Sequence, residues 1–413
     1  MNDAGYVHSQ RADPRDDAVK ILYVSGHPHL RTDAPSGYAT HMRETMRALA
    51  GAGCEVRPWV VGDLRRAPEG DAGTRDRPRS VLRRVVPGSV WQGLRDAALV
   101  RHDRALGPEL VRVVREERPD VVYERAAYLS SAAVRAARAE GVPLLLEVNA
   151  PYVEERRALH GRGTLTGLAT RWEREVLQGA ALVVTVSGAL ARFLAERGGI
   201  PPERVRVLPN AVDPEAFHPD VPSARGALGF APDAFVVGYV GSFIPWHRLD
   251  LLLRAVAAVR GVGVPAHALL VGDGPARADL EALAAELGVT GAVTFTGALP
   301  FAAVPSHVQA MDVCAVPGHA WYCSPIKLFE YGGAGKPVVA CDSEPVREVV
   351  DDGVHCLLPE GGVDAFAAAL VRLHADPALR ARLGTALAAR VRERHTWPRS
   401  AAQLVAWMRE VAG

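Results

Sequence analysis

The sequence of 413 residues lacks the features of several common classes of protein. Its five cysteines show no C-x-x-C spacing, which argues against a disulfide framework and against a zinc site. No apolar run approaches the roughly 18–20 residues of a membrane span, and the polar start from Met1 to Asp17 lacks the apolar core of a signal peptide. We therefore expect a soluble, cytoplasmic protein with reduced thiols, preceded by a disordered leader over residues 1–17.

The chain also lacks an excess of charge of either sign, with 48 basic and 47 acidic residues. A balanced field does not attract nucleic acid, so no nucleic-acid partner is expected. One segment departs from this balance, because the stretch from Asp63 to Arg84 is rich in arginine and contains proline and glycine. It predicts either a solvated, disordered loop or a weak contact with an anionic membrane surface.

Short apolar runs alternate with helical patterns from Val19 onward, which is typical of α/β folds in which helices cover a parallel sheet. A first set of strands is expected at residues 20–25, 55–61, 121–124, 144–148, 182–186 and 205–208, with helices at 38–52 and 106–117 among them. A second set is expected at 235–240, 268–271, 293–296, 313–316, 337–340 and 355–357. The pattern predicts two doubly wound units joined at the turn-rich stretch 210–222, with the active site in the cleft between them.

The most informative segment runs from Ser324 to Ala340 and reads S-P-I-K-L-F-E-Y-G-G-A-G-K-P-V-V-A. Ser324 is a preferred N-cap and Pro325 suits the first position of a helix, so two backbone N–H groups would be free at the helix end. These groups belong to Ile326 and Lys327. A phosphate suits this place, because the helix dipole and the Lys327 ammonium group both contribute positive charge.

Glu330 lies one turn beyond Lys327 on the same face, where its carboxylate would accept hydrogen bonds from two vicinal hydroxyls of a sugar. The segment thus predicts a site for a diphosphate with a sugar diol beside it. A capped surface helix with a Lys–Glu pair would show the same pattern. The run at residues 332–336 is not a triphosphate loop, since a Walker pattern requires glycine where Glu330 stands and serine or threonine where Pro337 stands.

Other segments accompany this one along nearly the whole chain. They are K-I-L-Y-V-S-G at residues 20–26, S-G-Y-A-T-H at 36–41, L-E-V-N-A-P at 146–151, V-L-P-N-A-V-D at 207–213, G-Y-V-G-S-F at 238–243, V-G-D-G-P at 271–275 and V-T-F-T-G at 293–297. In this order, and followed by the segment from Ser324, they resemble the motifs of retaining glycosyltransferases of the family 4 type, which have the GT-B fold.

This resemblance implies two Rossmann-like, doubly wound domains that face each other across a cleft. Residues 18–212 would form the acceptor-side domain, and residues 213–397 would form the domain that binds a nucleotide-sugar donor. A C-terminal helix over residues 398–413 would cross back to the first domain and bury Leu404, Trp407 and Val411 there. In such a protein the arginine-rich segment that begins at Asp63 would meet a phosphate-bearing acceptor.

The resemblance also implies the residues of the site. The donor-binding residues would be Gly37, Asn149, Gly241, Ser242, Gly272, Thr296, Gly297, Leu299, Tyr322, Ser324, Pro325 and Ile326. The catalytic residues would be His247, Arg248, Lys327 and Glu330. Gly37 would let the backbone approach the donor phosphates, and Glu330 would bind the donor ribose. Asn149 stands where many relatives have a histidine near the sugar, and an amide can bind a hydroxyl but cannot shuttle a proton.

Three positions on the donor side depart from the family pattern. Tyr322 stands where relatives have the first glutamate of an E-x(7)-E pair, which reaches the transferred sugar. Ser242 and His247 stand where relatives direct an arginine and a lysine at the diphosphate. Positive charge is needed there, because the leaving nucleoside diphosphate gains negative charge. We expect Arg248 and Lys327 to supply it.

The sequence therefore predicts a retaining glycosyltransferase that moves a hexose-like unit from a nucleotide diphosphate sugar to an acceptor hydroxyl of a glycan, glycolipid or secondary metabolite. No D-x-D pair, which other glycosyltransferases use to hold a divalent ion, occurs in the chain, so metal independence and no cofactor are expected. The alternatives are a non-catalytic nucleotide-sugar-binding partner of an active transferase, and a nucleotide-sugar epimerase. The composition, rich in Ala, Arg and Gly, suggests a GC-rich bacterial source, while donor, acceptor and oligomeric state stay open.

Overall fold

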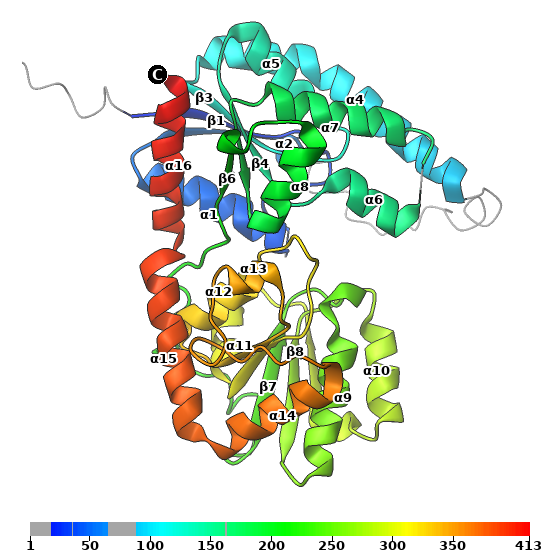
Figure 1. Cartoon of the computed structure of the whole chain (residues 1–413), viewed down its shortest axis with the longest axis vertical. Helices are drawn as coiled ribbons and strands as arrows, with labels where there is room; N and C mark the ends of the chain where they lie inside the picture. The colour runs from blue at the N-terminus through cyan, green and yellow to red at the C-terminus, as the bar shows by residue number, and fades with distance from the viewer. Residues whose placement is uncertain (1–17, 35, 65–87, 162) are drawn as a thin grey trace, which may run out of the picture.

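The computed structural model describes residues 18–34, 36–64, 88–161 and 163–413. The predicted leader, residues 1–17, and the arginine-rich part of the segment from Asp63 to Arg84 lie outside the described residues. The described chain forms two parallel sheets, each covered by helices, which stand one above the other in Figure 1. Within these ranges no helix is both long enough and apolar enough to cross a membrane.

The first sheet has the strand order β2-β1-β3-β4-β5-β6, and every pairing in it is parallel. Its strands are β1 (Lys20–Ser25), β2 (Glu55–Val60), β3 (Val121–Arg125), β4 (Leu144–Val148), β5 (Leu182–Thr185) and β6 (Val205–Val207). Its helices are α1 (Gly37–Gly51), α2 (Val61–Leu64), α4 (Gly88–Glu117), α5 (Ala132–Glu140), α6 (Tyr152–His160), α7 (Thr166–Gly179) and α8 (Gly188–Gly198). The predicted strands match closely, but the helix predicted at 106–117 is only the C-terminal part of α4, which begins at Gly88 and contains Pro108.

Alternate residues of these strands enter two separate cores, as the period of a strand requires. Ile21 and Tyr123 pack in the core beneath α1, whereas Leu22 and Val122 pack in the core beneath α4 and α5. Both faces of the sheet are therefore covered, which explains why its strands read as nearly continuous apolar runs.

The second sheet has the order β11-β10-β7-β8-β9 and is also parallel. Its strands are β7 (Phe235–Val240), β8 (Ala266–Val271), β9 (Val293–Gly297), β10 (Val313–Val316) and β11 (Val338–Ala340). Its helices are α9 (Leu249–Gly261), α10 (Arg277–Glu286), α11 (Val304–Gln309), α12 (Ile326–Gly333), α13 (Glu344–Arg347), α14 (Gly362–Ala375) and α15 (Pro377–Arg394). The strand predicted at 355–357 is wrong, since Leu357 makes only an isolated bridge with Val339.

In both sheets the strand order reverses beside the first strand, between β1 and β3 and between β7 and β10. Open α/β sheets bind ligands outside the carboxyl ends of the strands at such a point. Arg125 at the end of β3 and Gly241 just after β7 line one common cleft. The two switch points therefore face each other across it.

The last helix, α16 (Trp397–Ala412), leaves the second domain and packs beside α1 of the first, as Figure 1 shows. The predicted crossing is therefore confirmed, but its buried side differs from the prediction. Leu404 and Met408 are fully buried, whereas Trp407 and Val411 are only partly buried. Because a helix places i and i+4 on one face, the seam follows Leu404 and Met408.

The two connections between the domains run together at this crossing. The Val212 N–H donates to the His395 carbonyl at 2.9 Å, and the Trp397 N–H donates to the Val212 carbonyl at 3.1 Å. A separate contact joins the domains at the start of α8, where the Gly188 N–H donates to the Glu348 carboxylate at 2.9 Å. These contacts hold the two domains at two different places.

Leu404→Ala is expected to lower the free energy of unfolding by about 2–5 kcal/mol, because it leaves a cavity in a packed core. The side chain is 2% exposed in the parent. Trp407→Ala, at a partly exposed position of the same helix, is expected to cost less. Melting curves of the two variants compare them directly, and a larger loss in Trp407→Ala would contradict the observed register of α16.

Candidate functional site

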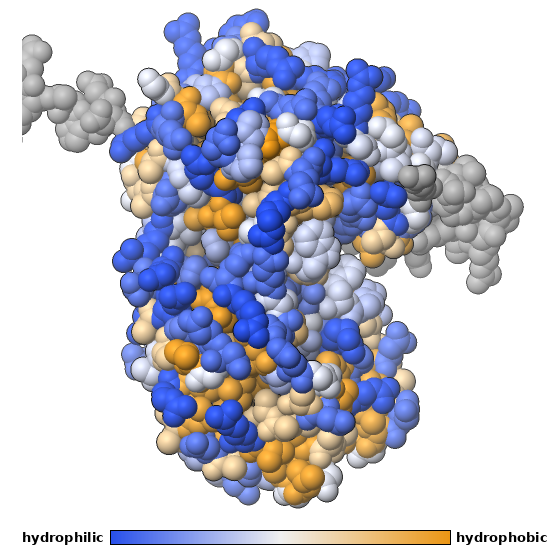
Figure 2. All heavy atoms as spheres, viewed as in Figure 1, coloured by the Kyte–Doolittle hydropathy of each residue, from blue (hydrophilic) through white to orange (hydrophobic). Residues whose placement is uncertain are grey.

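A cleft of about 410 Å³ lies between the carboxyl ends of the two sheets and is lined from both domains. Figure 2 shows hydrophilic side chains on both lobes of the visible face. Most of the predicted site residues line the cleft: Gly37, Asn149, Gly241, Ser242, His247, Gly272, Leu299, Ser324, Pro325, Ile326, Lys327 and Glu330. The predicted residues that do not line it are Arg248, Thr296, Gly297 and Tyr322.

Helix α12 begins at Ile326, one residue later than predicted, with Pro325 in the N-cap position. The prediction that Ser324 caps the helix is wrong. Its hydroxyl oxygen instead accepts a hydrogen bond from the backbone N–H of Asn210 at 3.1 Å, and the helix has no side-chain cap. The N-terminal end of α12 thus borders the cleft with its first N–H groups free of a capping side chain, as an anion site requires.

Lys327 and Glu330 lie together in this helix, and both are withdrawn from water. The Lys327 ammonium group lies 4.9 Å from the centre of the Tyr239 ring, and burial lowers the pKa of this lysine. Burial raises the pKa of Glu330 to about 7, although the nearby Lys327 charge lowers it. Two poorly solvated charged groups at the wall of a cleft favour a polar, charged ligand that completes their hydrogen bonds.

His247 lines the cleft as a neutral imidazole. Its Nδ1 lies 2.7 Å from the Ser242 carbonyl oxygen and 2.6 Å from the Tyr239 hydroxyl. Burial and the Lys327 charge lower the pKa of His247 to about 3. His247 and Ser242 therefore bring hydrogen-bonding groups to this wall. Neither carries the positive charge that the arginine and lysine of relatives have at these two positions.

Two turns approach each other closely where β7 and β8 end. A Cβ atom on Gly272 would lie 2.1 Å from the Gly241 carbonyl oxygen. Both glycines also adopt positive φ, at 140° for Gly241 and 136° for Gly272. Only glycine fits such a contact and such a conformation cheaply, so these residues let backbone form the wall of the cleft.

Arg248, which we expected to supply charge to the diphosphate, does not line the cleft. Its backbone adopts φ 52° at the start of α9, and its guanidinium group forms an ion pair with Asp250 at 3.0 Å. The side chain is 52% exposed. Lys327 is thus the predicted cation that the structure places at the cleft.

Thr296 and Gly297 are used to join strands. The Thr296 hydroxyl donates to the Gly297 carbonyl at 2.8 Å, and that carbonyl also accepts from the Gly272 N–H at 3.1 Å. Of the three donor-binding residues expected in this stretch, only Leu299 lines the cleft, together with Ala298.

Tyr322 reaches the other domain instead of the cleft. Its hydroxyl donates to the Glu155 carboxylate of α6 at 2.6 Å, and its carbonyl accepts from the Ser187 hydroxyl at 2.8 Å. The Tyr322 side chain therefore lies outside the cleft in which we expected it to contact a bound sugar.

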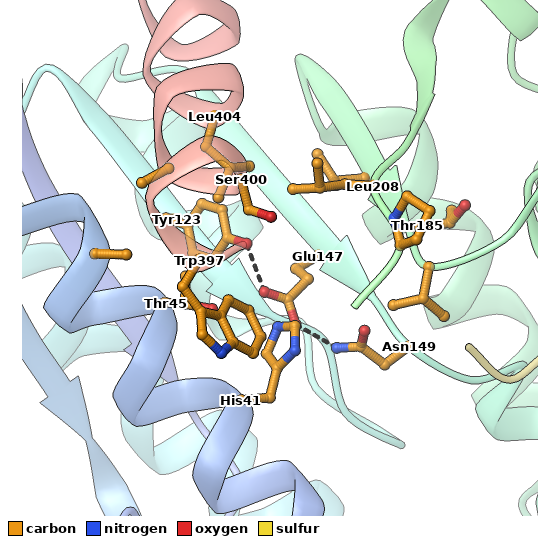
Figure 3. Close-up of a pocket in the computed structure, with 15 residues that line it drawn as sticks. His41, Thr45, Tyr123, Glu147, Asn149, Thr185, Leu208, Trp397, Ser400 and Leu404 are labelled. Atoms are coloured by element: carbon orange, nitrogen blue, oxygen red, sulfur yellow. Dashed lines mark hydrogen bonds and ion pairs between the residues drawn. The ribbon is translucent and has the colours of Figure 1, made fainter. Parts of the chain in front are cut away.

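The first domain contributes a buried cluster to the cleft, of which the sequence predicted only Asn149. Figure 3 shows Glu147 of β4 with His41, Tyr123 and Asn149 around it. The Glu147 carboxylate accepts from Arg125 at 2.6 Å and from the Tyr123 hydroxyl and the Asn149 amide. Burial alone would raise the pKa of Glu147, but the charges of His41 and Arg125 hold it well below its ordinary value. The sequence does contain a signal for this cluster, because Glu147 is a charged residue within an apolar strand. Such a residue is rarely buried without a partner.

The cluster fixes which groups the first domain presents. Because the Asn149 amide nitrogen is held by Glu147, its carbonyl oxygen is left buried and without a partner. An unpaired buried oxygen of this kind favours a ligand or water that donates a hydrogen bond. In the described ranges, no group of three His, Cys, Asp or Glu side chains is placed to hold a metal ion.

Comparisons with known protein families match both halves of the chain. Residues 35–216 match the family model described as Glycosyltransferase Family 4, and residues 234–376 match the model described as Glycosyl transferases group 1. The first model covers most of the domain that carries Glu147, and the second covers the wall that carries Lys327.

Among curated relatives, D-inositol 3-phosphate glycosyltransferase of Stackebrandtia nassauensis is 29% identical over 408 residues, covering 95% of this chain and 90% of the relative. A protein of the same name from Mycobacterium tuberculosis is 29% identical over 412 residues, covering 97% of this chain and 84% of the relative.

Two solved structures share the architecture. Sucrose-phosphate synthase from Thermosynechococcus elongatus has a TM-score of 0.73 at 19% identity, over 95% of this chain and 99% of the other. HepE from Anabaena, solved with UDP and glucose, has a TM-score of 0.69 at 18% identity, over 95% and 100%. At these identities the likeness shows the fold alone, which is the GT-B fold.

Proposed function

We infer, from the premise that this chain belongs to the glycosyltransferases with a family 4 domain followed by a group 1 domain, that it transfers a hexose-like unit from a nucleotide diphosphate sugar to an acceptor hydroxyl. The observation that carries this proposal is the wall formed by Lys327 and Glu330 at the start of α12, on one side of the cleft. The complexes of HepE with UDP and glucose support a donor of this class.

In the proposed reaction the diphosphate lies at the N-terminal end of α12 beside Lys327, while Glu330 accepts the ribose hydroxyls. When the glycosidic bond breaks, its electron pair leaves with the nucleoside diphosphate. Lys327 and the helix end stabilise the negative charge that grows on this leaving group. We propose retention through front-face attack, in which a departing phosphate oxygen takes the acceptor proton. Asn149 would accept a hydrogen bond from a sugar hydroxyl and takes no part in proton transfer.

The acceptor is proposed to bind on the first-domain wall, where Arg43 and Arg125 line the cleft. The name of the curated relatives makes D-inositol 3-phosphate the first acceptor to test. The alternative of a non-catalytic nucleotide-sugar-binding protein is favoured by one observation, the neutral His247 and Ser242 at the diphosphate wall. We further propose a cytoplasmic location.

The test incubates purified protein with UDP-, GDP-, ADP- and dTDP-linked hexoses, with and without the acceptor. Acceptor-dependent release of nucleoside diphosphate supports the proposal, and a product with the donor's anomeric configuration, measured by NMR, supports retention. Binding without turnover would favour the non-catalytic alternative, and neither binding nor turnover would contradict both.

We expect EDTA to leave the transfer rate unchanged, because Lys327 and the helix end supply the positive charge on the diphosphate. The rate is measured before and after dialysis against EDTA, with magnesium and manganese added back separately. A rate that falls on chelation and returns with either ion would contradict metal independence.

Tyr322→Phe is expected to lower the transfer rate about tenfold, since a hydrogen bond to a charged group contributes about 1.5–3 kcal/mol. The Kd for nucleoside diphosphate should stay near that of the parent, because the lost hydroxyl bonds Glu155 outside the cleft. Glu155→Gln should have a similar effect, and the double variant should be no worse than either. A changed preference among donor sugars would show instead that Tyr322 contacts the sugar.

A further inference from the structure

His41 of α1 touches both connections between the two domains. Its Nδ1 lies 2.8 Å from Oδ1 of Asn210, which lies just before Val212 on the connection from the first domain to the second. Its ring lies edge-on to Trp397 at the start of α16, with 5.1 Å between ring centroids. Figure 3 shows the Trp397 ring against His41. The residue is buried and also borders the cleft.

The surrounding hydrogen bonds fix the number of protons on this ring. Nε2 lies 2.9 Å from Oε1 of Glu147, and that carboxylate is ionised because it accepts from Arg125 and other donors. Nε2 must therefore donate. On the other side, the Asn210 amide nitrogen donates to the Ser324 carbonyl at 2.6 Å. A carbonyl only accepts, so the Asn210 atom facing His41 is its oxygen.

Both ring nitrogens of His41 thus face acceptors, and both bonds form only if both nitrogens carry hydrogen. A neutral ring would place a lone pair against one of the two oxygens. The cluster then holds two cations, His41 and Arg125, against the single carboxylate of Glu147. Its excess positive charge borders the cleft in which a diphosphate is proposed to bind.

The hydrogen bonds continue from His41 to the start of α12. Asn210 contacts Ser324 twice, through its side-chain amide at 2.6 Å and its backbone N–H at 3.1 Å. Ser324 directly precedes Pro325, the N-cap of the helix. The chain of contacts from Glu147 through His41 and Asn210 to Ser324 therefore joins the first-domain wall to the diphosphate wall.

We propose that His41, as an imidazolium, is a positioning residue that fixes the start of α12 relative to the first domain by holding Asn210. The proposal deepens the proposed transferase function and rests on it for its kinetic test. It assigns to His41 a role exerted through Asn210 and Ser324, with no proton transferred to the substrates.

The kinetic test compares His41→Gln, Asn210→Ala and the double variant with the parent, well below their melting temperatures. Glutamine can donate to only one of the two acceptors, so kcat/KM for the donor is expected to fall about tenfold in each single variant. The double variant should fall no further than the worse single variant, because both break the same chain. The matched control is His267→Gln, a histidine bonded to Thr294 at 2.8 Å on the second sheet, which should stay near the parent value.

Kinetics of His41→Gln equal to those of the parent would overturn the proposal, as would losses that multiply in the double variant. A second measurement needs no substrate: NMR of protein labelled with ¹⁵N in its histidine rings should show a ring with protons on both nitrogens that disappears in His41→Gln. A single bound proton on that ring would overturn the imidazolium. An inactive parent would count against the transferase function, while the NMR result would still decide the state of His41.

Discussion

Lys327→Ala is expected to lower kcat by about 10²–10³-fold, the usual effect of removing one group that stabilises developing charge. The structure places this cation at the cleft, while Arg248 is paired with Asp250 and His247 is neutral. Because charge on the diphosphate grows towards the transition state, kcat should fall more than the donor KM rises. The measurement is a steady-state rate series in donor at saturating acceptor.

Arg248→Ala is the contrasting variant for this experiment. From the sequence we expected Arg248 to supply positive charge to the diphosphate, but its exposed side chain bonds Asp250 outside the cleft, so the structure predicts a rate near that of the parent. Should Arg248→Ala lose activity like Lys327→Ala, the loop from Pro245 to Arg248 would have to rearrange when donor binds.

Glu330→Ala is expected to weaken nucleoside diphosphate binding about 100-fold, since each hydrogen bond to a charged group contributes about 1.5–3 kcal/mol. Glu330 is 9% exposed and lines the cleft, so little water replaces a lost ribose contact. Calorimetric titration with nucleoside diphosphate measures the change. Unchanged affinity would remove Glu330 from the ribose site.

The pH dependence of nucleoside diphosphate binding tests whether Glu330 must be ionised to bind the ribose. Burial raises the pKa of Glu330 to about 7 in the free protein, and the ionised form accepts the ribose hydroxyls. Affinity should therefore rise about tenfold from about pH 6 to pH 8 as the binding-competent fraction grows. The same raised pKa makes the contribution of Glu330 to stability favourable at low pH and lost as pH rises through about 7. In Glu330→Gln the part of the pH dependence due to this group should vanish, which separates it from titration of the nucleotide.

The parts predicted correctly from sequence are those set by neighbours along the chain. Lys327 and Glu330 share one helix face at a spacing of three residues, and strands such as β1 and β7 are apolar runs bounded by turns. Helix periodicity and apolar runs need no tertiary knowledge. The start of α12 was off by one residue because the hydroxyl of Ser324 is used by Asn210, which lies far away in sequence.

The parts that were missed depend on contacts between distant segments. Arg125 and Glu147 are partners in the β3–β4 register. His41 contacts Glu147 from a helix that lies more than a hundred residues earlier in the chain. Sequence spacing carries no information about such a register. The position of Tyr322 outside the cleft was unforeseen for the same reason, since its hydroxyl bonds Glu155 in the other domain.

Two of the places where the domains touch differ in their exposure to dissolved ions. At the start of α8, the Gly188 bond to Glu348 and the ion pair between Arg192 and Glu344 lie at the surface, where salt screens attraction over about 8–10 Å. The bonds between Asn210 and Ser324 are buried and are shielded from that screening. Added salt should therefore weaken the contact at the start of α8 more than the buried bonds between Asn210 and Ser324, so that opening of the cleft is a rotation about the crossing instead of a separation of whole bodies. Ionic strength would then set how readily the cleft admits donor and releases nucleoside diphosphate.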